Sequence, residues 1–366
     1  MPLEHWLAGA VMVSLTLYAL GAGADFGGGV WDLLSSGPRA RAQRALIAHA
    51  IGPIWEANHV WLILAVVLLF VCFPVAWADV SIALHVPLTV MLLGIVLRGS
   101  AFTFRSYDDA SDAAQLRWGR IFAVASVLTP LMLGVCVGAV ASGAVQVHDG
   151  RVVGGFVRPW LAPFPLAVGV LALGLFAFLA AVYLTVESGD RELREDFRRR
   201  ALASGIGVGA LAFVTLAVAR REAPLMWEGL LGRHWSLPLH AATGVAAVGA
   251  LAALWTRRFA LARTLAVIQV VLVLWGWGAS QFPYIVPPDI TFEEAAAPPA
   301  VLRAVLAALA AGAAILVPSL WALYRVFKSA RGEHTVPAPI RGGSADGGGP
   351  PAHGRARPNT SGGSPP

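Results

Sequence analysis

Long apolar stretches alternate with short polar ones along most of this chain. A segment needs about 20 residues to cross a hydrocarbon layer that is roughly 30 Å thick. Only α-helices satisfy their own backbone in lipid with such a continuous apolar pattern. We therefore predict an all-α integral membrane protein, a bundle of about nine transmembrane helices. The predicted spans cover residues 6–24, 59–78, 80–101, 119–144, 163–186, 201–219, 238–256, 259–282 and 301–325.

The composition supports this prediction. Of the 366 residues, 57% are hydrophobic and 13% are charged, and the mean hydropathy is +0.68. Soluble domains have roughly 45–50% apolar and about 25% charged residues. Cys72 and Cys136 lie inside apolar runs, so we expect two buried thiols and no disulfide. The N-terminus lacks the basic segment and cleavage site of a signal peptide, which indicates that the first apolar run is retained as a helix.

The placement of arginine predicts the orientation in the membrane. The net charge of +6 comes almost wholly from arginine, because Lys328 is the only lysine. Arginines are frequent after the first, third, fifth and seventh spans and scarcer after the others, which predicts an N-terminus outside and a C-terminus in the cytoplasm. Basic loops beside membrane helices are explained by topology and anionic lipid, so we expect no nucleic-acid partner. The arginines of the richer side are Arg39, Arg41, Arg44, Arg105, Arg117, Arg120, Arg191, Arg194, Arg198, Arg199, Arg200, Arg257, Arg258 and Arg263.

Two polar segments suggest how the chain is divided. Residues 187–200 carry interleaved acidic and basic side chains, typical of a charged, solvated cytoplasmic connector with no further role. We expect it to divide a transmembrane domain, residues 1–330, into a four-helix group ending near 186 and a five-helix group covering 201–330. Residues 331–366 are rich in Gly, Pro, Ser and Arg without an apolar period, which predicts a disordered cytoplasmic tail.

A carboxylate lies among glycines where the first span is expected to end. Asp25 lies within residues 21–29, which contain five glycines. Absent side chains let another helix or a cofactor approach the backbone closely. Asp25 is either a helix-end carboxylate that reaches headgroup water or a buried relay residue, because intramembrane carboxylates are rare without a function.

A second group of polar residues heads the second span. Glu56, Asn58 and His59 lie between Trp55 and Trp61. Ionisable groups at a membrane boundary cost several kcal/mol unless they face protein or trapped water, so each is a functional candidate. The alternative is an ordinary collar of aromatic and polar residues on a transmembrane helix, since indole prefers the headgroup level.

Arginines and histidines elsewhere in the spans allow two interpretations. Arg105 follows the third span and is expected to reach the membrane interface, whereas Arg98 lies deeper and is expected to pair with an acid or a lipid headgroup. A membrane histidine such as His49, His85 or His240 can be an axial haem ligand, or it can serve packing and hydrogen bonding. The prolines of residues 281–289 predict a fixed extracytoplasmic turn.

Four blocks, taken together and in order, resemble subunit II of the cytochrome bd-type quinol oxidases over roughly residues 5–328. They are Gly-Ala-Asp-Phe-Gly-Gly-Gly at 23–29, Gly-Pro-Ile-Trp-Glu-Ala-Asn-His-Val-Trp at 52–61, the segment from Arg98 to Arg105, and Phe-Pro-Tyr-Ile-Val-Pro-Pro at 282–288. The resemblance implies a terminal oxidase of the bacterial cytoplasmic (inner) membrane that oxidises quinol and reduces dioxygen to water. It implies that haem b and haem d belong to subunit I, an obligate partner without which this chain is inactive.

The resemblance also implies roles for individual residues. Glu56, where many members carry aspartate, is expected to collect protons at the cytoplasmic side, and Asp25 to pass them on, with Asn58 and His59 as further candidates on this route. Another acid of some members is absent, since Gly21 stands there. Trp55, Trp61, Arg98 and Arg105 are expected to be structural or to contact lipid or quinone. A structural quinone and a small third subunit are left open.

Two other functions are compatible with the residues alone. Polar groups within spans and glycine-interrupted helices also mark the substrate sites of secondary transporters. A purely structural subunit that carries no protons would have the same fold. Only variants of Glu56 and Asp25 distinguish this scaffold from a proton-conducting subunit.

Overall fold

The computed structural model describes residues 2–51, 55–107, 112–148, 151–153 and 155–330, of which some helix-end side chains are left out. The chain forms two compact units, residues 1–309 and residues 310–366. The second unit is described from Ala310 to Ala330, where it is helical. The predicted disordered tail, residues 331–366, lies outside the described residues.

Helices make up most of the described chain, with two short hairpins between them. The two-stranded sheets are antiparallel, β1 with β2 and β3 with β4. The elements are α1 (Leu3–Leu33), α2 (Ala40–Ile51), α3 (Trp55–Cys72), α4 (Pro74–Ala83), α5 (His85–Tyr107), α6 (Asp112–Ala141), β1 (Gln146–His148), β2 (Arg151–Val153), α7 (Pro163–Glu187), α8 (Arg191–Glu222), α9 (Pro224–Leu231), α10 (Ser236–Trp255), α11 (Phe259–Gln281), β3 (Tyr284–Val286), β4 (Ile290–Thr291), α12 (Phe292–Ala295) and α13 (Pro299–Ala330).

The helices confirm the predicted fold class. Within the described residues, 8 helices are long and apolar enough to cross a membrane, or 9 if α3 and α4 together count as one bent span. Helix α1 extends past the predicted span 6–24, and α8 begins before the predicted span 201–219. The second and third predicted spans differ in how the chain is divided into helices. The chain bends by 117° between α3 and α4, so the run 59–78 is not one straight helix. The run 80–101 begins in α4 and continues in α5.

Proline causes the break between α3 and α4. Pro74 is the first residue of α4 and has no N–H to continue the hydrogen bonding of α3. At the end of α3, the carbonyl of Cys72 accepts a hydrogen bond of 2.8 Å from the backbone N–H of Ala297, in the segment before α13. The end of α3 is thus satisfied by a segment far along the chain.

Two further expectations need correction. Five spans (α1, α3–α4, α5, α6 and α7) precede the charged connector and four (α8, α10, α11 and α13) follow it, so the grouping of four and five is wrong. Most of the connector is the first part of α8, and Phe197 within it is fully buried, so it is more than a solvated face. Sequence patterns also missed α2, α9, α12 and both hairpins, which are too short or too polar for a span.

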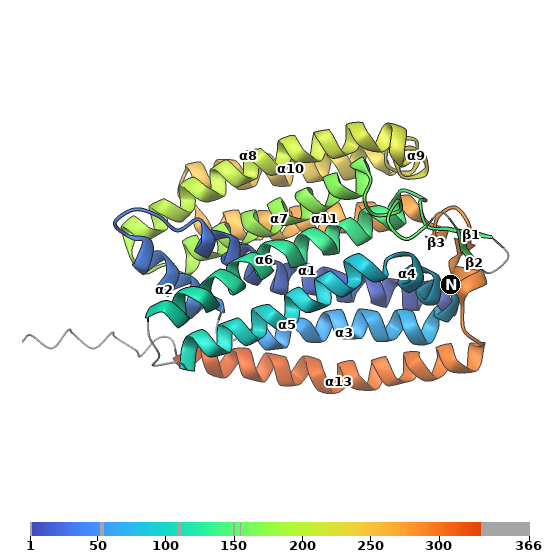
Figure 1. Ribbon diagram of the computed structural model, residues 1–366, viewed down its shortest axis with the longest axis horizontal. Coiled ribbons are helices and arrows are strands. Elements are labelled where there is room, and N and C mark those ends of the chain that lie inside the picture. Colours follow the sequence, from blue (N-terminus) through green and yellow to red (C-terminus); the bar gives the residue numbers. More distant parts are fainter. Residues whose placement is uncertain (1, 52–54, 108–111, 149–150, 154, 331–366) are drawn as a thin grey trace, which may run out of the picture. The chain divides into compact units, whose positions relative to one another are not determined.

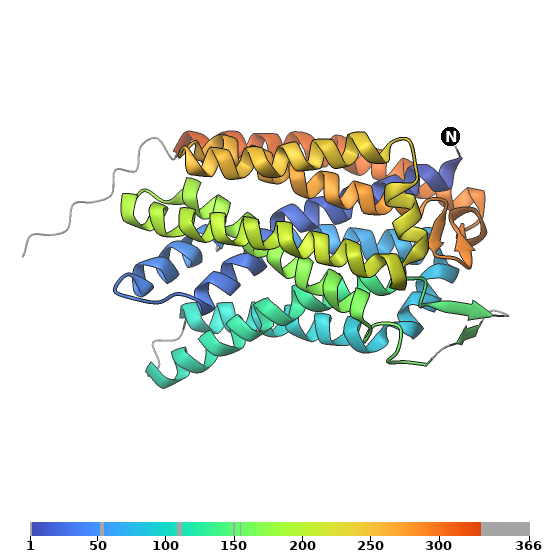
Figure 2. The same ribbon diagram turned by 90° about the horizontal axis from the view of Figure 1, so that it is seen from above.

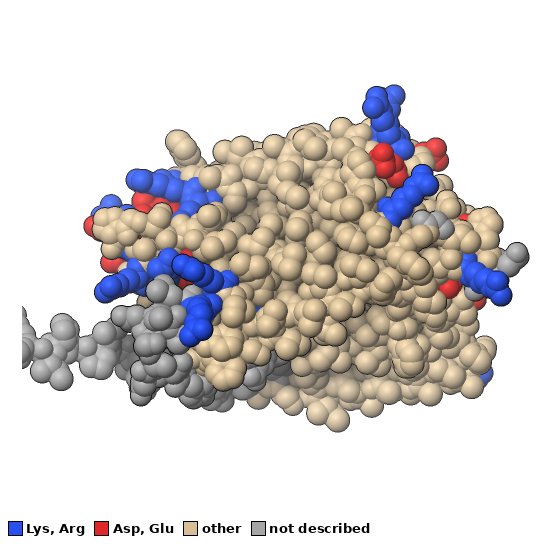
Figure 3. All heavy atoms as spheres, viewed as in Figure 1, with Lys and Arg blue, Asp and Glu red and all other residues tan. Residues whose placement is uncertain are grey.

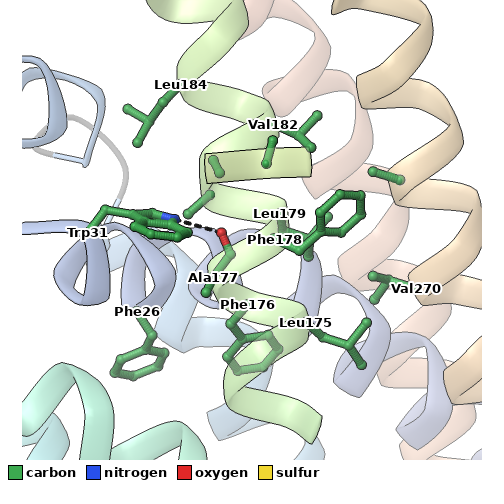
Figure 4. Close-up of a cluster of buried hydrophobic side chains, with 14 of the residues drawn as sticks. Phe26, Trp31, Leu175, Phe176, Ala177, Phe178, Leu179, Val182, Leu184 and Val270 are labelled. Atoms are coloured by element: carbon green, nitrogen blue, oxygen red, sulfur yellow. Dashed lines mark hydrogen bonds between the residues drawn. The ribbon is translucent and has the colours of Figure 1, made fainter. Parts of the chain in front are cut away.

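In the first unit, α7 is a central helix that packs against α1, α6 and α8 (Figures 1 and 2). Helix α1 also packs against α3 and α6, and α5 packs against α6. Figure 4 shows the largest apolar cluster, in which Phe26 and Trp31 of α1 lie beside residues of α7. The indole Nε1 of Trp31 donates a hydrogen bond of 2.7 Å to the backbone carbonyl of Ala177. Burial and this bond together fix α1 against α7.

Glycines of α1 permit this close packing, as the sequence predicted. A Cβ on Gly27 would overlap the backbone carbonyl of Phe176 in α7, and a Cβ on Gly29 would overlap the side chain of Ser126 in α6. Helix α1 does not end at these glycines but continues to Leu33. At Gly27 and Gly29, the groups that come close to the α1 backbone belong to two neighbouring helices of the same chain, α7 and α6.

The first unit has two distinct ends. The end that we call the α2 end carries α2 and the start of α8, and the end that we call the hairpin end carries the N-terminus, α9 and the two hairpins (Figure 1). On the face of this unit drawn in Figure 3, charged side chains gather toward the two ends and are absent from the surface between them. This distribution is typical of a protein that crosses a membrane.

Candidate functional site

Asp25 is a buried residue of α1 whose carboxylate is held by an amide. Its exposed fraction is 3%, and its Oδ2 accepts a hydrogen bond of 2.6 Å from Nδ2 of Asn58 in α3. Gly21, one turn earlier in α1, leaves room for this amide, since a Cβ there would lie 2.5 Å from Oδ1 of Asn58. The structure thus brings together Asp25 and Asn58, two predicted site residues from different spans.

Arg98 of α5 is buried in the same region, with an exposed fraction of 2%. Its Nε donates a hydrogen bond of 3.2 Å to Oγ of Ser126 in α6. Its guanidinium carbon lies 4.8 Å from the ring centroid of Phe26 and 5.1 Å from that of Phe122, both within the range of cation–π contacts. Burial of this kind rules out contact with a lipid headgroup within the described structure.

The opposite charges of Arg98 and Asp25 are close enough to interact electrostatically. They make no direct ion pair, so Asp25 is not the acid partner in contact that we expected for Arg98. Tyr18 of α1, which is 1% exposed, lies within the same electrostatic range of both residues. We call Tyr18, Asp25, Asn58, His59, Arg98 and Ser126 the buried polar cluster.

His59 borders this cluster from α3. Its ring centroid lies 6.0 Å from that of Tyr18 and 6.1 Å from that of Phe26. It also lies within electrostatic range of Arg98. The structure thus brings His59, a predicted site residue, next to Tyr18 and Phe26 of α1.

Two buried nitrogen and oxygen atoms of the cluster have no hydrogen-bond partner within the described residues. They are the hydroxyl oxygen of Tyr18 and Nη2 of Arg98. Buried polar groups are ordinarily paired with protein or with ordered water, and leaving one unpaired costs about 1–3 kcal/mol. Tyr18 and Ser126 were missed by sequence reasoning, although each is a polar residue inside an apolar run.

The other predicted site residues are placed only in part. Trp55 and Glu56 belong to the first turn of α3, and Arg105 to the last turn of α5, but their side chains lie outside the described part of the structure. Trp61 is partly buried and packs against the largest apolar cluster.

The remaining histidines and both cysteines are scattered over the fold. Nδ1 of His85 lies 2.9 Å from the carbonyl of Ile82, and Nδ1 of His240 lies 2.7 Å from the carbonyl of Ser236, while His49 is exposed on α2. Cys72 and Cys136 are free and buried, as predicted. The described residues contain no group of three or more His, Cys, Asp or Glu placed to hold a metal ion.

Comparison with protein families gives one match over nearly the whole chain. Residues 3–327 match the family of cytochrome bd terminal oxidase subunit II. A Bacillus subtilis (strain 168) protein named for subunit II of a cytochrome bd menaquinol oxidase is 23% identical over 322 residues, which are 85% of this chain and 91% of the relative. Subunit 2 of the cytochrome bd-I ubiquinol oxidase of Escherichia coli (strain K12) is 30% identical over 195 residues, about half of each protein.

A solved structure supports the same architecture. A chain of the bd oxidase from Geobacillus thermodenitrificans matches with a TM-score of 0.71 at 22% sequence identity. The match covers 89% of this chain and 99% of that chain. The arrangement of spans described above is therefore shared with a bd oxidase chain.

Proposed function

Since this chain belongs to the family of cytochrome bd terminal oxidase subunit II, a family of multi-pass membrane subunits of an oxidoreductase complex, we propose that it supplies the proton-access route of such an oxidase. In this proposal the chain packs against a haem-bearing subunit I in the bacterial cytoplasmic membrane and is inactive alone. The α2 end faces the cytoplasm, in keeping with its many arginines. The observation that carries the proposal is the buried hydrogen bond between Asp25 and Asn58 beside Arg98.

The chemistry of dioxygen reduction explains why such a route is needed. Reducing oxygen inside a medium of low dielectric constant builds up negative charge unless a proton accompanies each electron. Haem b and haem d, held by the partner, would supply the electron transfer, and this chain would supply protons. Only ionisable side chains or water can carry protons through a helical bundle.

The buried polar cluster is suited to hold a proton at an intermediate point of the proposed route. The Asn58 amide and the nearby Arg98 guanidinium both stabilise the charged form of Asp25, while burial favours the protonated form. These opposing influences let Asp25 alternate between the two forms. The unpaired Tyr18 hydroxyl and Arg98 Nη2 are donors that ordered water would satisfy, which extends the route beyond Asp25. Glu56, in the first turn of α3, lies before Asn58 on the same helix and is assigned the entry of the route.

We expect Asp25→Asn and Glu56→Gln to slow quinol-driven oxygen consumption by the purified oxidase about 10²-fold or more, since proton transfer through a positioned group typically contributes 10²–10⁴-fold. The haem absorption spectrum of the complex should not change. Glu222→Gln is the matched control, because Glu222 is an exposed acid at the far end of α8. Normal turnover of both variants would show that this chain is a scaffold.

A further inference from the structure

A pocket at the hairpin end is separate from the buried polar cluster. It has a volume of about 380 Å³ and is bordered by α9, the end of α11 and the turn that follows α11. Volumes of roughly 300–1,000 Å³ are typical of sites for small molecules. Its polar lining comes mainly from Glu228, Arg233, Ser280, Gln281 and Tyr284.

A close helix contact builds the wall of this pocket. A Cβ on Gly229 would overlap the backbone carbonyl of Ser280, so α9 rests directly on α11. The Oγ of Ser236, at the start of α10, lies 3.5 Å from the carbonyl oxygen of Gly229 and donates to it. The short helix α9 is therefore fixed against two long helices, and the pocket is a formed site.

Two opposite charges stand at the pocket. Glu228 and Arg233 both line it and are both exposed, and the structure shows no ion pair between them. Nη2 of Arg233 donates a hydrogen bond of 3.1 Å to the carbonyl of Phe282, which orients the guanidinium and leaves its other nitrogens free to donate. A ligand with one anionic and one cationic group would complement these two side chains.

A buried donor adds to this pattern. Gln281 lines the pocket, is 8% exposed, and its Nε2 has no hydrogen-bond partner within the described residues. Nearby apolar side chains remain open to the surroundings: Leu225 is 42% exposed and Phe282 is 43% exposed, and both line the pocket. The site therefore combines charge, a donor in need of an acceptor, and apolar surface at the end of membrane-crossing helices.

We propose that this pocket binds the headgroup of an aminophospholipid, phosphatidylethanolamine. Arg233 receives the phosphate, Glu228 receives the ammonium group, and the Gln281 amide donates to a phosphate or ester oxygen. The acyl chains lie along Leu225 and Phe282. This site does not depend on the proton route, so either proposal can fail without the other.

The test uses the purified oxidase reconstituted in nanodiscs and native mass spectrometry to count retained lipids. We expect the wild-type protein to retain phosphatidylethanolamine in preference to phosphatidylglycerol, which lacks the ammonium group. Arg233→Gln and Glu228→Gln should each weaken retention about tenfold, the effect of losing one charge-assisted hydrogen bond. Arg220→Gln is the control, since Arg220 is exposed at the end of α8 and does not line the pocket.

Further measurements distinguish a membrane lipid from a free headgroup as the ligand of the pocket. Soluble phosphoethanolamine should raise the melting temperature of the wild-type protein less than the lipid does, because it lacks acyl chains. If soluble phosphoethanolamine protects as well as the lipid, the site binds a free headgroup and the lipid assignment is wrong. Equal retention by the wild-type protein and both pocket variants, or recovery of a quinone in place of phospholipid, would also overturn the proposal.

Discussion

Charged residues are arranged in opposite ways in the buried polar cluster and at the surface of the α2 end. Inside, Arg98 makes one hydrogen bond, to the hydroxyl of Ser126, and no ion pair among the described residues, although Asp25 is within electrostatic range. At the surface, Arg39 makes three hydrogen bonds to carboxylates: two to Asp196, of 2.8 and 2.7 Å, and one to Glu192, of 3.1 Å.

The surface network joins α2 to α8 and is well satisfied. Gln43 of α2 donates to Asp196 at 3.0 Å and accepts from Arg200 at 2.7 Å. The hydrogen bonds to Asp196 raise the pKa of the Arg39 guanidinium above its ordinary value. The Arg39 side chain is 43% exposed, so water competes for its bonds and they contribute little to stability. The few bonds of the buried cluster matter more, because no solvent replaces them.

The largest effect is expected from Arg98→Leu. It leaves Asp25 buried without a compensating charge, which typically costs about 3–5 kcal/mol. We expect a strongly lowered melting temperature or poor assembly of the purified oxidase. Arg98→Lys, which keeps the charge, should be closer to the wild-type protein. An unchanged melting temperature for Arg98→Leu would mean that Asp25 is neutral in the folded protein.

An intermediate effect is expected from Asn58→Leu, which removes the donor to Asp25. A lost hydrogen bond to a buried acceptor costs about 1–3 kcal/mol. The comparison should be made by thermal unfolding alongside Thr264→Val, since Thr264 is exposed and its hydroxyl donates to the backbone carbonyl of Ala260 in the same helix. Equal melting temperatures of the two variants would show that the amide does not stabilise Asp25.

The smallest effect is expected from Arg39→Gln, despite the three bonds that it removes. Exposed ion pairs are screened by salt, so any loss in melting temperature should shrink as the salt concentration rises. Measuring the melting temperature at low and high salt tests this directly. A loss as large as that of Asn58→Leu, and independent of salt, would contradict the contrast between the two regions.

The sequence predicted the helical membrane fold and the family because long apolar runs and ordered motifs are local signals. It also indicated that glycines of α1 admit close neighbours, and Gly27 and Gly29 do so. It could not show that Asp25 and Asn58 are bonded, since that depends on how two distant helices pack. The break at Pro74 was readable in principle, because proline ends the hydrogen bonding of a helix, but hydropathy alone passes over it.

Other parts of the structure left weaker signals. α2 is too polar to be recognised as a span. At the start of α8, the charged residues predict exposure, but Phe197 between them is buried, and a count of charges does not reveal this. Tyr18 and Ser126 lie in runs that read as uniformly apolar. Their partners are chosen by tertiary packing, which no single segment specifies.

The bond between the Ala297 N–H and the Cys72 carbonyl gives the bend at Pro74 a consequence beyond its own helix. In a continuous helix that carbonyl would accept a hydrogen bond from the N–H of Ala76, but the chain bends sharply between α3 and α4. Restoring a straight helix there by Pro74→Ala would offer it a local partner and release the segment that leads into α13. Pro74 therefore influences two parts of the chain: the bent span to which it belongs and the segment that leads into α13. A substitution at Pro74 should also affect how the C-terminal helix inserts into the membrane.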